Sequence, residues 1–368
     1  MAQELFTPID KWNPPEVLDF ARDFPPPRVF AHRGSFVWWW WMFFYKEGGV
    51  RKQAIAFWTT KTYGKLKVSG QDWNEPMGLE GDEKCYSLNT MSTFWIWDGK
   101  QFKEAKPVTS RLVTDTTKGV SIVSDHVAMH TEGKDFKMEF KEREGIGLKI
   151  DSILPTPPPV KYKRTMVTKK MGFDTLKIYH AGWRGRVLVD GKENEVDGSL
   201  YMQNICLNTP AFPWLWGVFH KDDGSYFTYF TTFIGPYMFR KKPTCAPRWD
   251  NRFKPMNKNL NYTPAGQETK RFKHVRYKVV REGKGLPGFE LSGELGDERL
   301  RIKVQTLGKN TYDFDRKRLF RNRFFYNEYP SKVVSFEHTD ADGKVHKDDP
   351  ELWTGNCEHS WGLLINKN

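Results

Sequence analysis

The segment 355–362 near the C-terminal end holds the densest group of polar side chains next to aromatic ones. In an extended strand, successive side chains point to opposite faces. Alternation then gives two sets: Cys357, His359 and Trp361 on one face, and Asn356, Glu358 and Ser360 on the other. Histidine exchanges a proton near neutral pH, and a carboxyl buried among apolar groups has a raised pKa and can act as an acid. Glu358 and His359 are therefore candidate catalytic residues; alternatively, either is a hydrogen-bonded core residue.

A second polar group, Tyr201, Gln203 and Asn204, lies on another segment that is expected to be extended. Phenol and amide groups both donate and accept hydrogen bonds, so they can orient a hydroxyl or carbonyl of a ligand. We take Tyr201 and Asn204 as candidate catalytic residues that position water or a substrate hydroxyl, and Gln203 as substrate-binding. A satisfied hydrogen-bond network within the core explains the same residues equally well.

Large aromatic side chains gather in the run Val37–Tyr45, which contains four consecutive tryptophans, and in the run Trp214–His220. Nine large residues are too few for a membrane-spanning helix, which needs about 20. They predict a strand that is dry on both faces, with one face in a core and the other on a second apolar space. The candidate residues for binding a bulky apolar ligand are Trp39, Trp41, Trp214, Trp216, His220 and Trp361. The same residues could also be ordinary core stripes.

Short strands separated by glycine turns account for most of the periodic segments of the chain. Apolar residues alternate with polar or charged ones at 121–124, 136–140, 148–151, 301–304 and 332–336. Asp-Gly pairs, typical of tight turns, stand at 98–99, 190–191, 223–224 and 342–343. This pattern predicts an all-β fold of the sandwich or barrel type. The segment 15–22, with a proline at its first turn, is predicted to be a helix.

The two halves of the chain repeat one order of features. Each half opens with an aromatic hairpin, at 37–60 and at 214–230, and closes with an Asp-Gly-Lys turn followed by a strand that a glycine leads. The order predicts two related β-domains packed together, 1–207 and 208–368. The proline-rich stretch 155–159 is an alternative boundary, but it would divide the first repeat.

The 368 residues carry 58 Lys and Arg against 45 Asp and Glu, a net charge of +13. Basic clusters lie at 161–164, 240–242, 270–273 and 316–323. They suit either solvated strand edges or contacts to phosphate groups. Without a recognised nucleic-acid module we expect no nucleic-acid partner, and we keep transient attraction to an anionic membrane surface as an alternative.

The remaining motifs argue against a metal or a nucleotide cofactor. The four cysteines are far apart and the first residues form no signal-peptide pattern, so a cytoplasmic protein with reduced thiols is expected. The segment 283–288 matches GxGxxG, but no long amphipathic helix follows it. His126 and His130 lack a third ligand at a convincing spacing. We therefore expect no cofactor and no metal.

Several of these segments together resemble the lipocalin-like AttH and carotenoid 1,2-hydratase group. The matching features are the aromatic opening strand, the valine-rich Asp-Gly-Lys segment 185–198, the Trp-x-Trp strand at 214–216 and the Glu-His-Ser-Trp-Gly element at 358–362. Kievitone hydratase-like enzymes belong to the same group, and fungal Diels–Alderases share its architecture. The resemblance implies two lipocalin-like β-domains, a hydrophobic pocket and cofactor-independent chemistry on isoprenoid- or polyketide-like substrates.

One element departs from the family pattern. The family's Asp-His-x-Trp-Gly element follows the Asp-Gly-Lys segment of the first repeat, whereas here the segment 201–205 reads Tyr-Met-Gln-Asn-Ile. The hypothesis is a hydratase, dehydratase or isomerase in which Glu358 donates a proton to carbon and Trp39, Trp214 and Trp216 stabilise the cation. A non-catalytic lipid or terpenoid carrier and a pericyclase are the alternatives.

Overall fold

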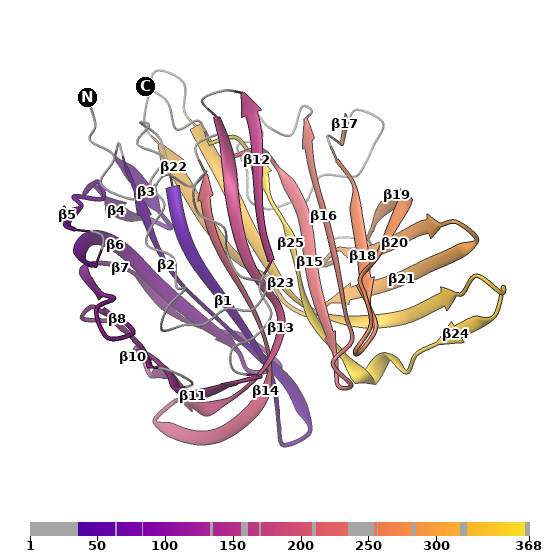
Figure 1. The fold of residues 1–368 in the computed structure, drawn as a ribbon, viewed down its shortest axis with the longest axis horizontal. Coiled ribbons are helices and arrows are strands. Elements are labelled where there is room, and N and C mark those ends of the chain that lie inside the picture. The colour runs from indigo at the N-terminus through magenta and orange to yellow at the C-terminus, as the bar shows by residue number, and fades with distance from the viewer. Residues whose placement is uncertain are drawn as a thin grey trace. The chain divides into compact units, whose positions relative to one another are not determined.

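The computed structural model (Figure 1) describes residues 36–62, 65–82, 84–132, 135–155, 161–168, 171–207, 211–234, 254–255, 257–281, 285–316 and 322–364. Almost all regular structure in these ranges is β-strand, which confirms the all-β prediction. The helix expected at 15–22 lies outside the described residues. Contacts divide the described chain into two compact units, 36–99 with 103–207, and 100–102 with 211–364.

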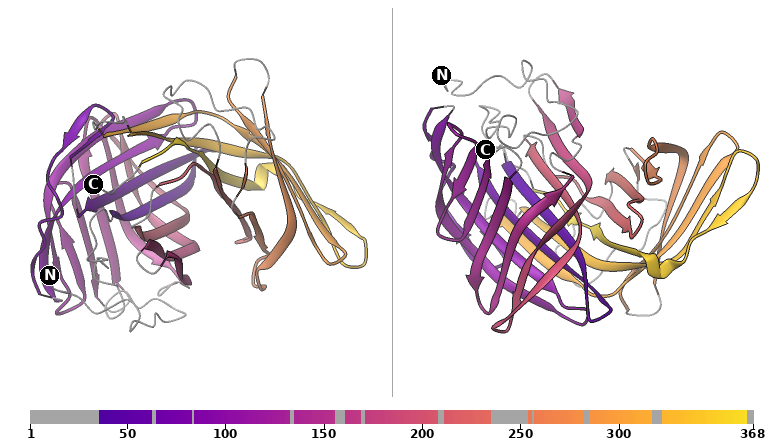
Figure 2. Two further views of the ribbon diagram at one scale, coloured as in Figure 1. Left: turned by 90° about the horizontal axis from the view of Figure 1, so that it is seen from above. Right: turned by 60° about the horizontal axis from the view of Figure 1, so that its bottom comes forward.

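The first unit is a closed β-barrel. Its ring consists of β1 (Phe36–Glu47), β2 (Val50–Lys61), β6 (Cys85–Trp97), β7 (Phe102–Asp115), β8 (Val120–Val123), β9 (Val127–Glu132), β10 (Asp135–Arg143), β11 (Ile146–Leu154), β13 (Met171–Val189) and β14 (Lys192–Leu207). The order is β11-β10-β9-β8-β7-β6-β2-β1-β14-β13, and β13 pairs with β11 to close the ring. The right view of Figure 2 shows these strands, indigo to pink, side by side. Outside the ring lie β3 (Leu66–Val68), β4 (Gln71–Trp73), β5 (Glu80–Gly81) and β12 (Lys161–Thr168).

The aromatic run forms β1, which is paired on both sides. Trp39 lies opposite Trp58 of β2 and opposite Asn204 of β14. The odd-numbered residues of the run enter the barrel core, and the even-numbered residues Trp40, Met42 and Phe44 are also buried. β1 is therefore dry on both faces over most of its length, as the composition of the run predicts.

The second unit is also a closed β-barrel. Its ring consists of β15 (Trp214–Lys221), β16 (Tyr226–Ile234), β18 (Asn259–Thr263), β19 (Lys270–Val280), β20 (Gly288–Leu295), β21 (Glu298–Thr306), β23 (Asn322–Thr339) and β25 (Trp353–His359). The order is β21-β20-β19-β18-β16-β15-β25-β23, and β23 pairs with β21. Outside the ring lie β17 (Lys254–Pro255), β22 (Asn310–Arg316), β24 (Val345–Lys347), β26 (Trp361–Gly362) and a 3₁₀ turn (Pro350–Leu352).

In each barrel, the first strand of the ring along the chain pairs with the last strand of that ring. β1 pairs antiparallel with β14, and β15 pairs antiparallel with β25. The hairpin between β13 and β14 turns at Asp190 and Gly191, which have φ angles of 52° and 77°. Two successive positive φ angles match the hairpin turn that Asp-Gly favours, so this local signal was a reliable guide to the end of β13.

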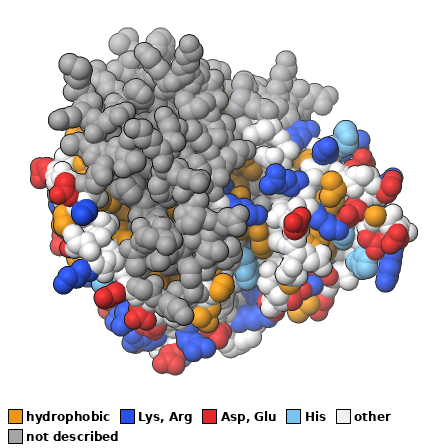
Figure 3. All heavy atoms as spheres, viewed as in Figure 1, with side chains coloured by type: hydrophobic (Ala, Val, Ile, Leu, Met, Phe, Trp, Pro, Cys, Tyr) orange, Lys and Arg blue, Asp and Glu red, His pale blue; other side chains and the backbone are white. Residues whose placement is uncertain are grey.

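Basic and acidic side chains are interspersed on the described part of the face shown in Figure 3. On the outer side of the second barrel, Glu290 lies 3.2 Å from Lys278 and 3.9 Å from Lys303. Lys270, from the basic cluster 270–273, lies 2.6 Å from Glu298. Within the described ranges, no helix is long and apolar enough to cross a membrane.

Candidate active site

A row of three side chains crosses adjacent strands of the second barrel. Trp216 on β15 lies opposite Glu358 on β25, and Glu358 lies opposite Glu328 on β23. Residues that are paired across strands point to the same face. The neighbouring row, Gly217 and Cys357, points the other way, and Cys357 belongs to the barrel core. Glu328 and Glu358 therefore lie together on the outer face of these strands, where both are buried.

Two donors hold the carboxyl group of Glu358. The indole Nε1 of Trp214 donates to Oε2 at 2.7 Å, and the hydroxyl of Tyr326 donates to Oε1 at 2.6 Å. The Trp214 ring centre lies 4.9 Å from that of Phe324 and 5.5 Å from that of Tyr326. Both oxygens of the Glu358 carboxyl therefore accept hydrogen bonds from aromatic side chains.

Glu328 has a different environment. Its side chain is fully buried; Asn356 Nδ2 donates to Oε2, and no donor reaches Oε1. Burial raises the pKa of Glu328 well above its ordinary value, and the negative charge of Glu358 raises it further. Both effects disfavour a second negative charge in the pair. We call Glu328 and Glu358 the carboxyl pair.

No sequence pattern pointed to Glu328 or Tyr326 as site residues. Both lie in the aromatic segment 324–329 of β23, where Glu328 interrupts a run of Phe, Tyr and Asn. A carboxyl inside an otherwise aromatic strand is the signal that could have identified it, because a glutamate is rarely buried without a partner. The partner, Glu358, is 30 residues later in the chain, and only strand pairing shows their proximity.

His359 lies on the opposite face of β25 from Glu358. Its ring is fully buried, with ring centres at 6.1 Å from Phe233, 6.1 Å from Phe289 and 5.6 Å from Trp361. Phe233 and Phe289 belong to the barrel core. Burial lowers the pKa of His359 to about 3, and the positive charges of Arg281 and Lys309 act in the same direction. The imidazole is therefore neutral, and it does not share a site with the carboxyl pair.

We expect His359→Phe to flatten the pH dependence of stability below neutral pH. The unfolded chain protonates His359 below its ordinary pKa of 6.5, whereas the folded chain does so only near pH 3. Wild-type protein should thus lose about 1.4 kcal/mol per pH unit in this window from this residue, or about 2 kcal/mol between pH 7 and pH 5. Denaturant titrations of both proteins at the two pH values test this. An identical pH dependence in wild type and variant would contradict it.

Cys357 is held as a neutral thiol inside the second barrel. The hydroxyl of Tyr229 lies 2.9 Å from its Sγ, and burial raises the pKa of Cys357 to about 12. A thiol needs a lowered pKa to act as a nucleophile, so this environment argues against a nucleophilic role for Cys357. Gly217 makes room for the arrangement, because a Cβ there would lie 2.4 Å from Cε1 of Tyr229.

Gly217→Ala should therefore displace the Tyr229 ring and expose Cys357. We expect a loss of about 1–3 kcal/mol in the free energy of unfolding, the usual cost of overpacking a core. We also expect Cys357 to react faster with a thiol reagent in the folded variant than in the folded wild type. Mass spectrometry of the labelled peptide measures this rate. Cys206, buried in the first barrel, is the internal control. Unchanged labelling of both cysteines would show that the ring does not protect the thiol.

The polar residues predicted on β14 form contacts within the first unit. The Tyr201 hydroxyl donates to Gln203 Oε1 at 2.9 Å, on the face that carries Trp40 and Met42. Asn204 points to the other face, and its Nδ2 donates to the Trp38 carbonyl at 3.1 Å. Tyr201 and Asn204 therefore lie on opposite faces of β14, and each donates a hydrogen bond within the first unit.

The predicted aromatic ligand contacts fall in different places. Trp39 and Trp41 are buried in the core of the first barrel, whereas Trp214 and Trp216 flank the carboxyl pair. His220 lies four residues beyond Trp216 on β15, opposite Thr354, and its ring centre is 6.3 Å from that of Tyr226. Trp361 contacts His359 on the other face of β25.

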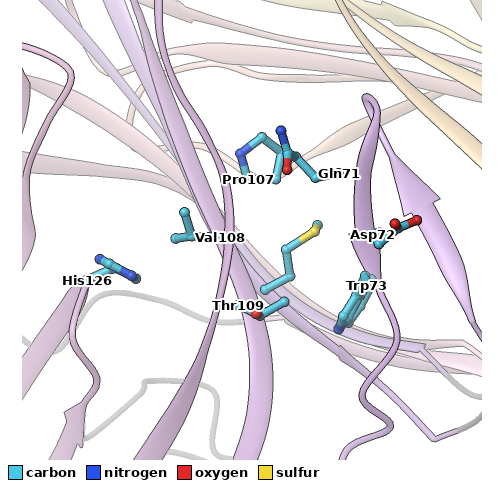
Figure 4. Close-up of a pocket in the computed structure, with 8 residues that line it drawn as sticks. Gln71, Asp72, Trp73, Pro107, Val108, Thr109 and His126 are labelled. Atoms are coloured by element: carbon cyan, nitrogen blue, oxygen red, sulfur yellow. The ribbon is translucent and has the colours of Figure 1, made fainter.

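A cavity of about 370 Å³ lies in the first unit (Figure 4). Gln71, Asp72 and Trp73 from β4 and residues 107–109 from β7 line it, together with Met91 and His126. Burial lowers the pKa of His126, and the charge of Arg143 contributes. Within the described ranges, no group of three or more His, Cys, Asp or Glu side chains is arranged to hold a metal ion.

Comparison with solved structures finds the same architecture. The chain aligns with an AttH-assigned protein from Nitrosomonas europaea at a TM-score of 0.55 and 12% sequence identity, over 98% of this chain and 100% of that chain. Kievitone hydratase from Nectria haematococca aligns over 96% of this chain and 97% of its own, at a TM-score of 0.45 and 10% identity. No family model matches the chain, and no curated protein matches it either. The expected resemblance is confirmed at the level of the fold: the chain has the AttH-like, lipocalin-like architecture.

Proposed function

We propose that this protein is a cofactor-independent hydratase, dehydratase or isomerase that acts on a bulky apolar substrate of the isoprenoid- or polyketide-like class. The unequal setting of the carboxyl pair carries the proposal. Glu358 accepts hydrogen bonds from Trp214 and Tyr326, whereas Glu328 is fully buried with one oxygen that no donor reaches. Two carboxyls in unequal environments can supply an acid and a base in one site.

The pair can run a balanced acid–base cycle. In the hydration direction, Glu328 gives its proton to one alkene carbon, and the alkene π electrons form the new C–H bond. The cation on the other carbon lies against the rings of Trp214 and Tyr326, whose π faces stabilise positive charge. Glu358 takes a proton from water as the water oxygen bonds to that carbon. The pair again holds one proton, and its transfer to Glu328 restores the starting state.

This assignment moves the proton donor from Glu358, the donor expected from sequence, to Glu328. The reason is that burial and the negative charge of Glu358 raise the pKa of Glu328, whereas both oxygens of Glu358 already accept hydrogen bonds from Trp214 and Tyr326. Trp214, which donates to Glu358, is only partly buried, so its indole ring is the proposed point of approach for an apolar substrate. Trp216, opposite Glu358 on the same face, provides further apolar wall.

The test is incubation of the full chain with a panel of prenylated aromatic compounds, terpenoid alkenes and polyketide-derived alkenes in D₂O. A hydratase adds water and one carbon-bound deuterium to an alkene, which mass spectrometry of the extracted product detects. An isomerase incorporates deuterium at carbon without adding water. Either product supports acid–base chemistry at carbon, and the glutamine variants described in the Discussion attribute it to the carboxyl pair.

Two other results would overturn the proposal in favour of a different class. Tight binding of several unrelated lipids, with no product and no deuterium at carbon, is expected of a carrier. Cyclisation of a polyene without deuterium, unaffected by glutamine at positions 328 and 358, is expected of a pericyclase. The two outcomes differ because only the second consumes its ligand.

A further inference from the structure

Three adjacent strands of the second barrel carry rows of basic side chains on their outer face. β20 pairs with β19 on one side and with β21 on the other, and Figure 1 shows the three strands side by side. Their apolar residues belong to the barrel core, so the residues that alternate with them point outward. The outward residues form three rows across the strands: Lys273–Glu294–Arg299, Arg276–Ser292–Arg301 and Lys278–Glu290–Lys303. We call these nine residues the basic face.

The basic face has an excess of positive charge that the chain does not neutralise. It holds six basic residues against two acidic ones, a net charge of +4. Glu290 already serves both Lys278, at 3.2 Å, and Lys303, at 3.9 Å. Among the residues that the structure describes, none forms an ion pair or hydrogen bond with the side chains of Arg276 or Arg301, and both are exposed. These two arginines flank Ser292 at two strand spacings, or about 10 Å, from each other.

Protection of a strand edge does not explain these charges. Basic side chains on an edge strand discourage pairing with another chain. Three of the six basic residues lie on β21, which has no free edge because it pairs with β20 on one side and with β23 on the other. Like charges that lie close together weaken a fold by mutual repulsion. An anionic partner removes this repulsion, so the basic face is better explained as a binding surface.

Neighbouring side chains favour a membrane surface over a nucleic acid. No residue of the basic face is aromatic, whereas proteins that bind single-stranded nucleic acids stack the bases on aromatic rings. Two valines border the face instead, with exposed fractions of 48% for Val334 and 51% for Val345. Val334 lies at the register shift between β21 and β23, and Val345 is paired with Thr339, which is paired with Arg299. Anionic headgroups attract the basic residues, and exposed apolar side chains can enter the interface of a bilayer.

We propose that the basic face docks the protein on a bilayer that is rich in anionic phospholipid. Arg276 and Arg301 bind headgroup phosphates, because a guanidinium group donates two parallel hydrogen bonds to one phosphate. The other basic residues add attraction over a longer range, and Val334 and Val345 contact the interface. Docking needs neither a substrate nor the carboxyl pair, so it succeeds or fails independently of the proposed catalytic function.

The test is co-sedimentation of the full chain with vesicles of phosphatidylcholine alone or of equimolar phosphatidylcholine and phosphatidylserine. We expect at least tenfold tighter binding to the anionic vesicles, and this preference should fall as sodium chloride is added. The double variant Arg276→Gln with Arg301→Gln should bind the anionic vesicles at least tenfold more weakly. The control is Lys118→Gln with Lys137→Gln, which removes the same charge from two exposed positions of the first unit and should change binding little.

Ser292 allows a second comparison at the centre of the basic face. Ser292→Glu places a negative charge between the two arginines and should weaken binding to the anionic vesicles, whereas Ser292→Gln adds a side chain of similar size without charge and should not. Equal binding to the two kinds of vesicle would overturn the proposal. So would equal effects of the two double variants, or of the two Ser292 variants. Tighter binding to a DNA duplex than to the anionic vesicles would assign the face to a nucleic acid and also overturn it.

Discussion

Glu328→Gln should lower turnover of an alkene substrate by about 10²- to 10⁴-fold, the usual contribution of a general acid. Glutamine keeps the shape of the side chain and can still accept from Asn356, but it holds no acidic proton. The measurement is the initial rate of deuterium incorporation at carbon. If the variant keeps wild-type turnover, Glu328 is not the proton donor.

Folding of the same variant can be checked from the sign of its pH dependence. The raised pKa of Glu328 stabilises the folded wild type fully only below the ordinary pKa of 4.5, and this stability is lost as the pH rises toward the folded-state pKa. Glutamine has no such titration, so Glu328→Gln should be at least as stable as wild type at pH 8. If the variant is inactive but at least as stable as wild type, it has lost catalytic activity and kept its fold.

Glu358→Gln provides the second half of the experiment. We expect turnover to fall by about as much as in Glu328→Gln, because the pair would lose its base. Turnover of the double variant should be little lower than that of either single variant. Glu337→Gln, a partly exposed carboxyl on β23, is the matched control and should leave turnover unchanged. Additive losses in the double variant would show that Glu328 and Glu358 do not act as one unit.

Trp41→Ala should destabilise the first barrel by about 3–5 kcal/mol, the range for removing a large buried aromatic side chain. Trp41 is fully buried, and its ring centre lies 5.9 Å from Phe136, 6.2 Å from Phe43 and 6.4 Å from Trp58. The cavity left by the indole cannot close without moving these rings. Denaturant titration measures the loss, and hydrogen exchange over 36–61 locates it.

Trp38→Ala is the control for this substitution, because Trp38 lies on the same strand but is only partly buried. We expect a clearly smaller loss of stability from Trp38→Ala. The comparison also decides the role of the tryptophan run. If Trp41→Ala instead left stability intact and weakened the binding of an apolar substrate, Trp41 would line a ligand site, as the sequence suggested, and not a packed core.

Sequence determined the strands and the character of their faces. Asp-Gly turns fix local backbone conformation, and the tryptophan run of β1 is too apolar to leave either face in water. Both signals depend on residues that are close in the chain, so no knowledge of the fold is needed to interpret them. Alternation likewise placed Glu358 and His359 on opposite faces of one strand.

Tertiary structure alone decided which face meets which partner. Strand pairing brings Glu328 beside Glu358, and barrel closure turns His359 inward among Phe233 and Phe289. The same pairing placed Trp41 in a core, although its residue type suits a ligand wall equally well. Hydrogen bonds and desolvation depend on residues far apart in sequence, and they set the protonation of Glu328. The sequence supplies the ionisable and aromatic side chains, and the register of the paired strands decides which of them become neighbours.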